Sequence, residues 1–171
     1  YGVLYGVLVI RELGFTPLVL GMLVGLGGVG ALLGAFFAAR WRCKLRQVLA
    51  VMILTNVVTL VFMMSGNVWV ALLALAFGQL VGDAAYSIYA IYEKSSYQML
   101  VPDYLLGRAN ASVSFLTMGV FPIGSLVAGA VGGVIGVREA LWLASWGFML
   151  TSLWLMLSPV RQLDKVTMAE A

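Results

Sequence analysis

The chain has 171 residues, of which 63% are hydrophobic and 10% are charged, with a net charge of +3. Soluble chains carry about 25% charged residues, and a soluble domain of this length lacks the interior to bury so many apolar side chains. This composition excludes a disordered segment, a disulfide-rich secreted domain and a nucleic-acid-binding protein. Histidine is absent and Cys43 is the single cysteine, which excludes histidine catalysis and a multi-thiolate metal site. The chain is therefore expected to be solvated mainly by lipid.

The first ten residues form an apolar segment that ends at Arg11 and Glu12. Ten helical residues span about 15 Å, which is half of a bilayer core of about 30 Å. A signal peptide would begin with a basic region, and this segment has none. We therefore interpret it as the second half of a transmembrane helix, and the sequence as a fragment of a longer protein.

Five further segments are long and apolar enough to cross a bilayer. The segment 17–39 begins with Pro17, which suits the first turn of a helix. The run 47–82 has no charged residue and is too long for one helix, and the turn signal Ser65-Gly66-Asn67 divides it. The predicted fold is an all-α bundle of membrane helices in residues 1–160, followed by a tail at 161–171. The predicted complete spans are 17–39, 47–65, 68–92, 109–136 and 140–158.

The basic residues are unequally divided between the two sides of the predicted membrane. Arg11 and Arg138 lie on one side, and the other eight lie on the opposite side. Cytoplasmic loops carry an excess of lysine and arginine, so the second side is expected to be cytoplasmic. The net charge therefore reports topology, and we expect a multi-pass protein of the cell membrane with a cytoplasmic C-terminus. The eight residues are Arg40, Arg42, Lys44, Arg46, Lys94, Arg108, Arg161 and Lys165.

Glycine is concentrated in two of the predicted helices. The helices at 17–39 and 109–136 hold six glycines each, whereas 47–65 holds none and 140–158 holds one. Small residues spaced by four allow close helix packing in membranes, so the Gly-poor helices are expected to face lipid. Grouping the helices in threes indicates an inverted three-plus-three repeat, although glycine is also generally frequent in membrane helices. The predicted packing residues are Gly21, Gly25, Gly30, Gly34, Gly129 and Gly133.

Asp83 is the charged residue that lies deepest within a predicted span. A carboxylate at mid-bilayer costs at least ~2.5 kcal/mol if it faces lipid, so it should face protein or a water-filled path. Gln79 and Tyr86 lie on the same face of the helix as Asp83. We expect Asp83 to be the proton-coupling residue, and Gln79 and Tyr86 to face a substrate cavity. The alternative is that Asp83 only hydrogen-bonds or pairs with a neighbouring helix.

Other polar features have simpler interpretations. Glu93 and Lys94 at the cytoplasmic end indicate interfacial anchoring or a gate salt bridge. Pro122 interrupts the helix at 109–136 and is expected to kink it. The sequence contains no nucleotide-binding loop, nucleophile elbow or cluster of metal ligands, so an enzyme is not expected.

Four segments of the sequence carry motifs in addition to the six-helix pattern. They are Gly34-Ala-Phe-Phe-Ala-Ala-Arg40-Trp-Arg42-Cys-Lys44, Gln98-Met-Leu-Val-Pro102-Asp-Tyr-Leu-Leu-Gly107-Arg108, Pro122-Ile-Gly124 and Leu157-Ser158-Pro159-Val-Arg161. With these segments the chain resembles the C-terminal half of a major facilitator superfamily transporter of the bacterial drug and siderophore exporter branch, and the resemblance covers nearly the whole chain. Ala38 and Ala39 depart from it, because they stand where the family's cytoplasmic loop has an aspartate.

This resemblance implies that the helices are numbers seven to twelve of twelve. Helices seven and ten would line the central cavity, eight and eleven would pack between the halves, and nine and twelve would face lipid. The branch mostly exports small hydrophobic or amphipathic molecules in exchange for protons, by alternating access. The implied partners are the N-terminal six-helix half, lipid and a small-molecule substrate, in a monomeric full-length protein that needs no cofactor beyond the proton gradient. Arg40, Arg42, Lys44, Glu93 and Arg108 are candidates for a cytoplasmic gate.

Two alternatives belong to other classes. A small membrane scaffold or assembly protein would be a stable six-helix product with its own start codon near Tyr1. A homodimeric six-helix permease would instead crosslink as a dimer in membranes.

Overall fold

The computed structural model describes residues 2–40, 45–63 and 66–158, and the regular elements within these ranges are all helices. The predicted all-α fold is therefore confirmed. Arg42, Lys44 and the predicted tail at 161–171 lie outside the described residues. The elements are α1 (Gly2–Val7), the π-helix η1 (Leu8–Glu12), α2 (Pro17–Arg40), α3 (Leu45–Met63), α4 (Val68–Phe77), the π-helix η2 (Gly78–Gly82), α5 (Asp83–Leu100), α6 (Asp103–Ile135) and α7 (Val137–Leu157).

Five of the described helices are long and apolar enough to cross a membrane, as the sequence predicts. One of them, Val68–Leu100, is a single helix of 33 residues composed of α4, η2 and α5. It begins after a turn in which Gly66 has a φ of 70°. The Asn67 side chain caps it by accepting a hydrogen bond from the amide of Trp69 at 3.0 Å.

Two helices extend further than the apolar segments predict, both at the end of the bundle where α5 ends and α6 begins. The helix predicted at 68–92 continues to Leu100, and the helix predicted from 109 begins at Asp103. An apolar run shows only which part of a helix lies in lipid. The helix itself can continue through charged residues beyond the membrane. The break comes at Val101, because the proline that follows disfavours a helical conformation there.

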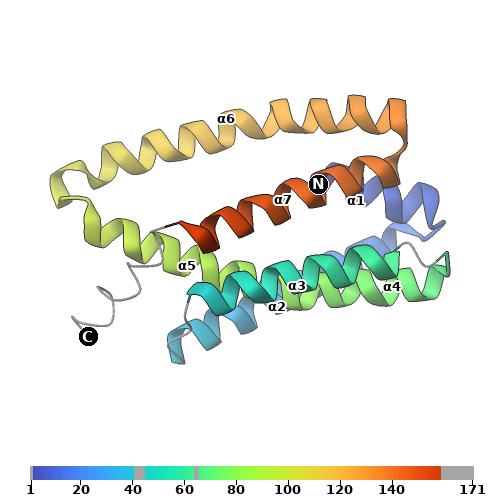
Figure 1. Ribbon diagram of the computed structural model, residues 1–171, viewed down its shortest axis with the longest axis horizontal. Coiled ribbons are helices and arrows are strands. Elements are labelled where there is room, and N and C mark those ends of the chain that lie inside the picture. The colour runs from blue at the N-terminus through green and yellow to red at the C-terminus, as the bar shows by residue number, and fades with distance from the viewer. Residues whose placement is uncertain (1, 41–44, 64–65, 159–171) are drawn as a thin grey trace.

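The long helices lie side by side, and the chain turns at the two ends of the bundle (Figure 1). Helix α5 packs on α2, α3 packs between α5 and α7, and α6 contacts α7 and α1. The ends of α2 and α5 and the starts of α3 and α6 share one end of the bundle. The described basic residues of the predicted cytoplasmic side belong to this end, and Arg11 and Arg138 belong to the other.

Helix α2 approaches η2 and α5 so closely that the backbones touch. A methyl group on Gly30 would overlap the carbonyl of Leu80, and one on Gly34 would overlap the carbonyl of Ala84. Close packing of this kind needs residues without a side chain. The four other predicted packing glycines have nothing within 4 Å of a built Cβ atom. They are Gly21, Gly25, Gly129 and Gly133.

The open surroundings of Gly21 and Gly25 follow from their helical positions. The buried stripe of α2 contains Leu23, Gly27, Gly30 and Gly34. Gly21 and Gly25 each lie two residues before a member of this stripe, which places them about 200° around the helix. On α6, the contact with α1 falls at Gly132, where a Cβ atom would lie 2.9 Å from Leu4.

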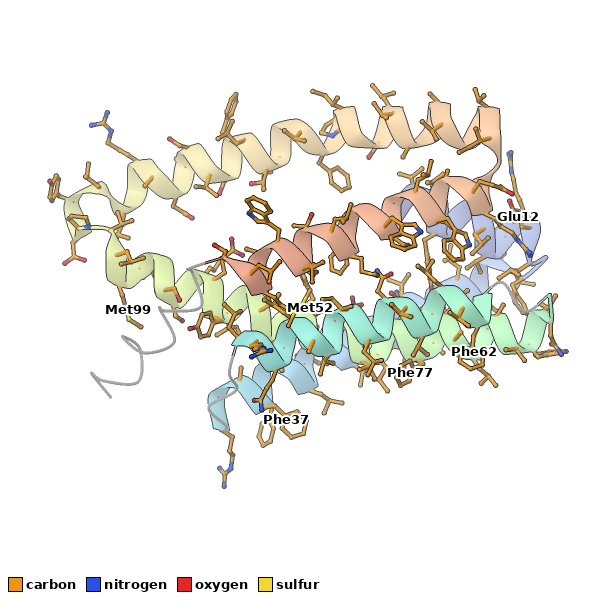
Figure 2. All side chains as sticks on the ribbon, in the orientation of Figure 1. Glu12, Phe37, Met52, Phe62, Phe77 and Met99 are labelled. Carbon is orange, nitrogen blue, oxygen red and sulfur yellow. The ribbon has the colours of Figure 1, made fainter. Side chains whose placement is uncertain are left out.

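The Gly-poor helix at 47–65, which is predicted to face lipid, has one face in the core of the bundle. The spanning segment of α3 is 39% buried, more than that of any other described span, whereas the segment of the Gly-rich α6 is 6% buried. Glycine permits close backbone approach, but large side chains fill an interior equally well. Leu49 and Met52 of α3 pack with Ala85 of α5 and with the end of α7. Figure 2 shows Phe62 and Phe77 pointing outward from the opposite side of α3 and α4.

Candidate functional site

A π-helical turn lies directly before Asp83 in the middle of the long helix. π-Helical turns are rare within α-helices and are frequent at functional sites. The turn is bounded by Gly78 and Gly82, and both glycines face α3. A Cβ atom on Gly78 would lie 2.6 Å from the Thr59 hydroxyl, and one on Gly82 would lie 3.6 Å from the methyl group of Thr55. Two threonines spaced by four therefore fit against two glycines spaced by four.

A cavity of about 550 Å³ lies beside this turn. Its walls come from α1, η1, α3, α7 and the long helix, and its lining draws on both hydrophobic clusters of the core. Asp83 is the one charged residue among the lining residues. The polar lining consists of Tyr5, Thr55, Asn56, Thr59, Gln79, Asp83, Tyr86 and Ser145. The apolar lining consists of Leu8, Met52, Leu60, Leu75, Gly78, Gly82, Leu141, Ala144 and Phe148.

The structure places Gln79, Asp83 and Tyr86 together on the wall of this cavity. They come from η2 and α5, and they lie one turn apart along one face of the helix. Gln79 and Asp83 are half-buried, and the Tyr86 side chain is exposed. The Tyr86 ring packs near that of Tyr89, with 6.4 Å between the ring centres.

Asp83 lies between the cavity and helix α2. A Cβ atom on Gly27 would overlap the Asp83 carboxylate. The same Cβ atom would lie 3.4 Å from the Gln79 amide nitrogen. Within the described parts of the chain, Asp83 forms no ion pair. A carboxylate without a cation inside a membrane-spanning helix is costly, and the cost falls when a proton or a cation neutralises it. The site is therefore chemically suited to bind one of these.

A family model of the major facilitator superfamily, described as transmembrane secretion effector, matches residues 3–171. The chain belongs to this family. No curated protein and no solved structure matches it. The chain is thus a multi-pass membrane protein of a transporter family, in agreement with the five described spans and with the resemblance to major facilitator transporters.

The gate candidates of the transporter lie away from the cavity. Arg40 ends α2, Glu93 lies on α5 and Arg108 lies on α6, and all three are exposed. None of them lines the cavity. Arg42 and Lys44, the other two candidates, lie outside the described residues.

An ion pair joins η1 to the start of α7, at the end of the bundle opposite to Arg40 and Arg108. The Arg138 guanidinium donates to the Glu12 carboxylate at 2.9 Å. The two side chains are 34% and 29% exposed. Figure 2 shows Glu12 at this end of the bundle. Glu12 follows Arg11 directly in the sequence, and Arg11 and Arg138 are predicted to lie on the same side of the membrane.

The contribution of α3 to the cavity was not predicted from the sequence. Thr55, Asn56 and Thr59 all line it, and Thr59 donates to the carbonyl of Ala74 at 3.5 Å. The signal was present, because these polar residues at positions i, i+1 and i+4 share one face of an otherwise apolar helix. The Asn56 side-chain oxygen is buried without a hydrogen-bond partner among the described residues. Among the described residues, no group of three or more His, Cys, Asp or Glu side chains could hold a metal ion.

Proposed function

We propose that the chain forms half of a secondary active transporter that exports small hydrophobic or amphipathic molecules in exchange for protons. Asp83 carries the proton, and Gln79 and Tyr86 contact the substrate. The observation that carries this proposal is the position of Asp83, the one charged group on the wall of a 550 Å³ cavity and part of a membrane-spanning helix. Cavities of about 300–1,000 Å³ hold small-molecule ligands.

The proposed proton coupling depends on the Asp83 carboxyl group, which alternates between a protonated and a charged state. The charged state is disfavoured in a low-dielectric site, so Asp83 binds a proton when the cavity opens to the acidic side. Substrate replaces the proton on the other side, and the proton gradient supplies the energy. Asp83 lies next to a π-helical turn, which offers a local place for the helix to change its conformation.

The exposed surface of α6 supports a twelve-helix protein in which these are helices seven to twelve. Phe115, Phe121 and Leu126 are each more than 70% exposed on this helix. Apolar side chains of a membrane helix also face lipid, so the glycines of α6 add the more specific support. Gly129 and Gly133 lie on this surface with open space around them, as close packing against a second six-helix unit requires. The full-length protein is then a monomer of two halves.

The charge distribution supports a cell-membrane protein whose C-terminus is cytoplasmic. Arg40, Arg46, Lys94 and Arg108 lie at one end of the described bundle, and Arg11 and Arg138 lie at the other. The first end is cytoplasmic by the positive-inside rule.

The proposal is tested by export of the neutral dye N-phenyl-1-naphthylamine from preloaded, energised cells that express the full-length protein. The wild-type protein is expected to export the dye, and a protonophore is expected to stop export. Asp83→Asn should abolish export at an unchanged protein level. Asp103→Asn is the matched control, because Asp103 is exposed and does not line the cavity. Wild-type rates in Asp83→Asn, or export that ignores the protonophore, would contradict the proposal.

A further inference from the structure

The cavity wall ends in a layer of leucines on the side of Arg11 and Arg138. On each of the four helical segments that line the cavity, the lining residue nearest to this end is a leucine. These leucines are buried and belong to one hydrophobic cluster of the core. A packed apolar constriction excludes water and ions. The four residues are Leu8 of η1, Leu60 of α3, Leu75 of α4 and Leu141 of α7.

The ion pair between Glu12 and Arg138 lies directly beyond this layer. Glu12 follows Leu8 by four residues and Arg138 precedes Leu141 by three, so each charged residue lies about one helical turn further out. The guanidinium and the carboxylate, 2.9 Å apart, join the two segments that supply these two leucines. The pair therefore holds two sides of the cavity wall together at the end where Arg11 lies.

The π-helix η1 is the part of this wall that is best suited to move. It has five residues, and π-helical turns are rare and frequent at functional sites. A turn follows it at Gly14, whose φ of 70° lies in the left-handed region that favours glycine. The other three leucines of the layer lie in α-helices of at least ten residues. A movement of η1 would break the Glu12–Arg138 pair and take Leu8 out of the layer.

We propose that the four leucines and the Glu12–Arg138 pair form an outer gate of the cavity, and that η1 is its moving part. This inference rests on the proposed function, which places this end outside the cell, and it adds the control of access to Asp83. The closed gate separates the Asp83 carboxyl group from the external solution. The pair is about one third exposed and is screened by solvent, so the leucines supply the larger part of the barrier. All parts of the gate belong to this chain, so it opens by a local movement of η1.

The gate is tested by the rate at which a cysteine in the cavity reacts with a reagent added outside the cell. Ala144→Cys places a thiol in the lining, three residues inward of Leu141. The full-length protein, with Cys43→Ser and otherwise without cysteine, is treated in intact cells with 2-(trimethylammonium)ethyl methanethiosulfonate, which does not cross the membrane. Thr16→Cys, in the exposed turn after η1, is the accessible reference. We expect the cavity cysteine to react at least about tenfold more slowly than the reference. Equal rates would overturn the inference.

Charge variants test the ion pair. Each rate is divided by that of Thr16→Cys in the same background, which cancels changes in surface potential. Glu12→Gln should make the cavity cysteine react about two- to fivefold faster, as expected for a partly exposed pair. Exchanging the two charges, with Glu12→Arg and Arg138→Glu, should restore the slow rate. Arg11→Gln is the matched control, because Arg11 is exposed at the same end and forms no ion pair among the described residues. Equal rates in Glu12→Gln and Arg11→Gln would contradict the role of the pair.

A leucine variant tests the apolar layer. Leu75→Ala should raise the rate at least about tenfold, because it opens the layer without changing any charge. Leu49→Ala is the matched control, because Leu49 is as buried as Leu75 but belongs to the other hydrophobic cluster and does not line the cavity. The control should loosen the fold to a similar extent and leave the rate unchanged. An equal increase in both variants would show general loosening and would contradict the gate. If Leu75→Ala does not fold, the charge variants decide.

The two proposals fail separately. If the cavity cysteine reacts as fast as the reference while Asp83→Asn still abolishes export of N-phenyl-1-naphthylamine, the gate is wrong and proton coupling stands. If the gate variants act as expected while export is independent of the proton gradient, the gate stands and the coupling proposal is wrong.

Discussion

The carboxylate of Asp83 lies against Gly27 of α2, so closely that a methyl group on residue 27 would overlap it. Gly27 is buried and helical, so the requirement for glycine comes from space and not from backbone conformation. Gly28, its neighbour, has nothing within 4 Å of its Cβ position. Gly27 thus leaves room for the carboxylate against α2, and Gly28 provides an adjacent residue for comparison.

We expect Gly27→Ala to displace the Asp83 carboxylate from α2 and to change the pH dependence of export. A displacement of about 1 Å at a reacting group is enough to lower a rate by tenfold or more. Initial rates of dye export across a series of pH values measure the effect. Gly28→Ala should keep the wild-type profile. A wild-type pH profile in a well-expressed Gly27→Ala protein would show that Gly27 does not position Asp83.

The backbone contact between α2 and α5 predicts a strong asymmetry between Gly34 of α2 and Gly147 of α7. Gly34→Ala pushes a methyl group into the Ala84 carbonyl, and overpacking of this kind destabilises by about 1–3 kcal/mol. Gly147→Ala faces open space on a helix that is expected to face lipid, and should be neutral or stabilising by up to about 1 kcal/mol, through helix propensity. Thermal unfolding of the purified protein in detergent compares them. Equal unfolding temperatures for the two variants would contradict the packing.

The ion pair between Glu12 and Arg138 should couple the two segments weakly. Both side chains are about one third exposed, so solvent screens the pair, and we expect a coupling of about 0.2–1 kcal/mol. A double-mutant cycle with Glu12→Gln and Arg138→Gln measures it from unfolding free energies. The coupling should shrink in 1 M salt. Strictly additive single variants at low salt would show that the pair contributes nothing.

Reporter fusions check the proposed orientation. Alkaline phosphatase should be inactive at the C-terminus and active after Gly66, which lies in a turn at the opposite end of the bundle. Green fluorescent protein should show the reverse pattern. A phosphatase that is active at the C-terminus would invert the topology and place the Glu12–Arg138 pair on the cytoplasmic side.

Several features were predictable because they depend on one segment at a time. Charge-free apolar runs identified the five complete spans. The face shared by Gln79, Asp83 and Tyr86 follows from helical periodicity, and the structure places all three on one cavity wall. Helical periodicity also places Thr55, Asn56 and Thr59 on one face of their helix. This polar face was not predicted, because leucine and valine dominate the segment around it.

Other features depend on which helices meet and are not encoded in any single segment. Gly25 and Gly27 look equivalent in the sequence, yet Gly27 contacts Asp83 and Gly25 faces open space. The π-helical turn before Asp83 likewise has no signal beyond two glycines spaced by four, a pattern that also occurs at ordinary helix contacts. These details require the position of α2 and α3 relative to the long helix.

Competition between a proton and substrate at Asp83 is the central claim, and proton release on binding tests it most directly. Dansylcadaverine, a fluorescent amphipathic amine with one ammonium group, is added to the purified full-length protein in weakly buffered detergent solution at mildly acidic pH, and a pH-sensitive dye reports the change. The wild-type protein should release about one proton for each probe bound, because the ammonium replaces the proton on a single carboxylate. Asp83→Asn should release none. Binding to the wild-type protein without proton release, or the same release from Asp83→Asn, would contradict the claim.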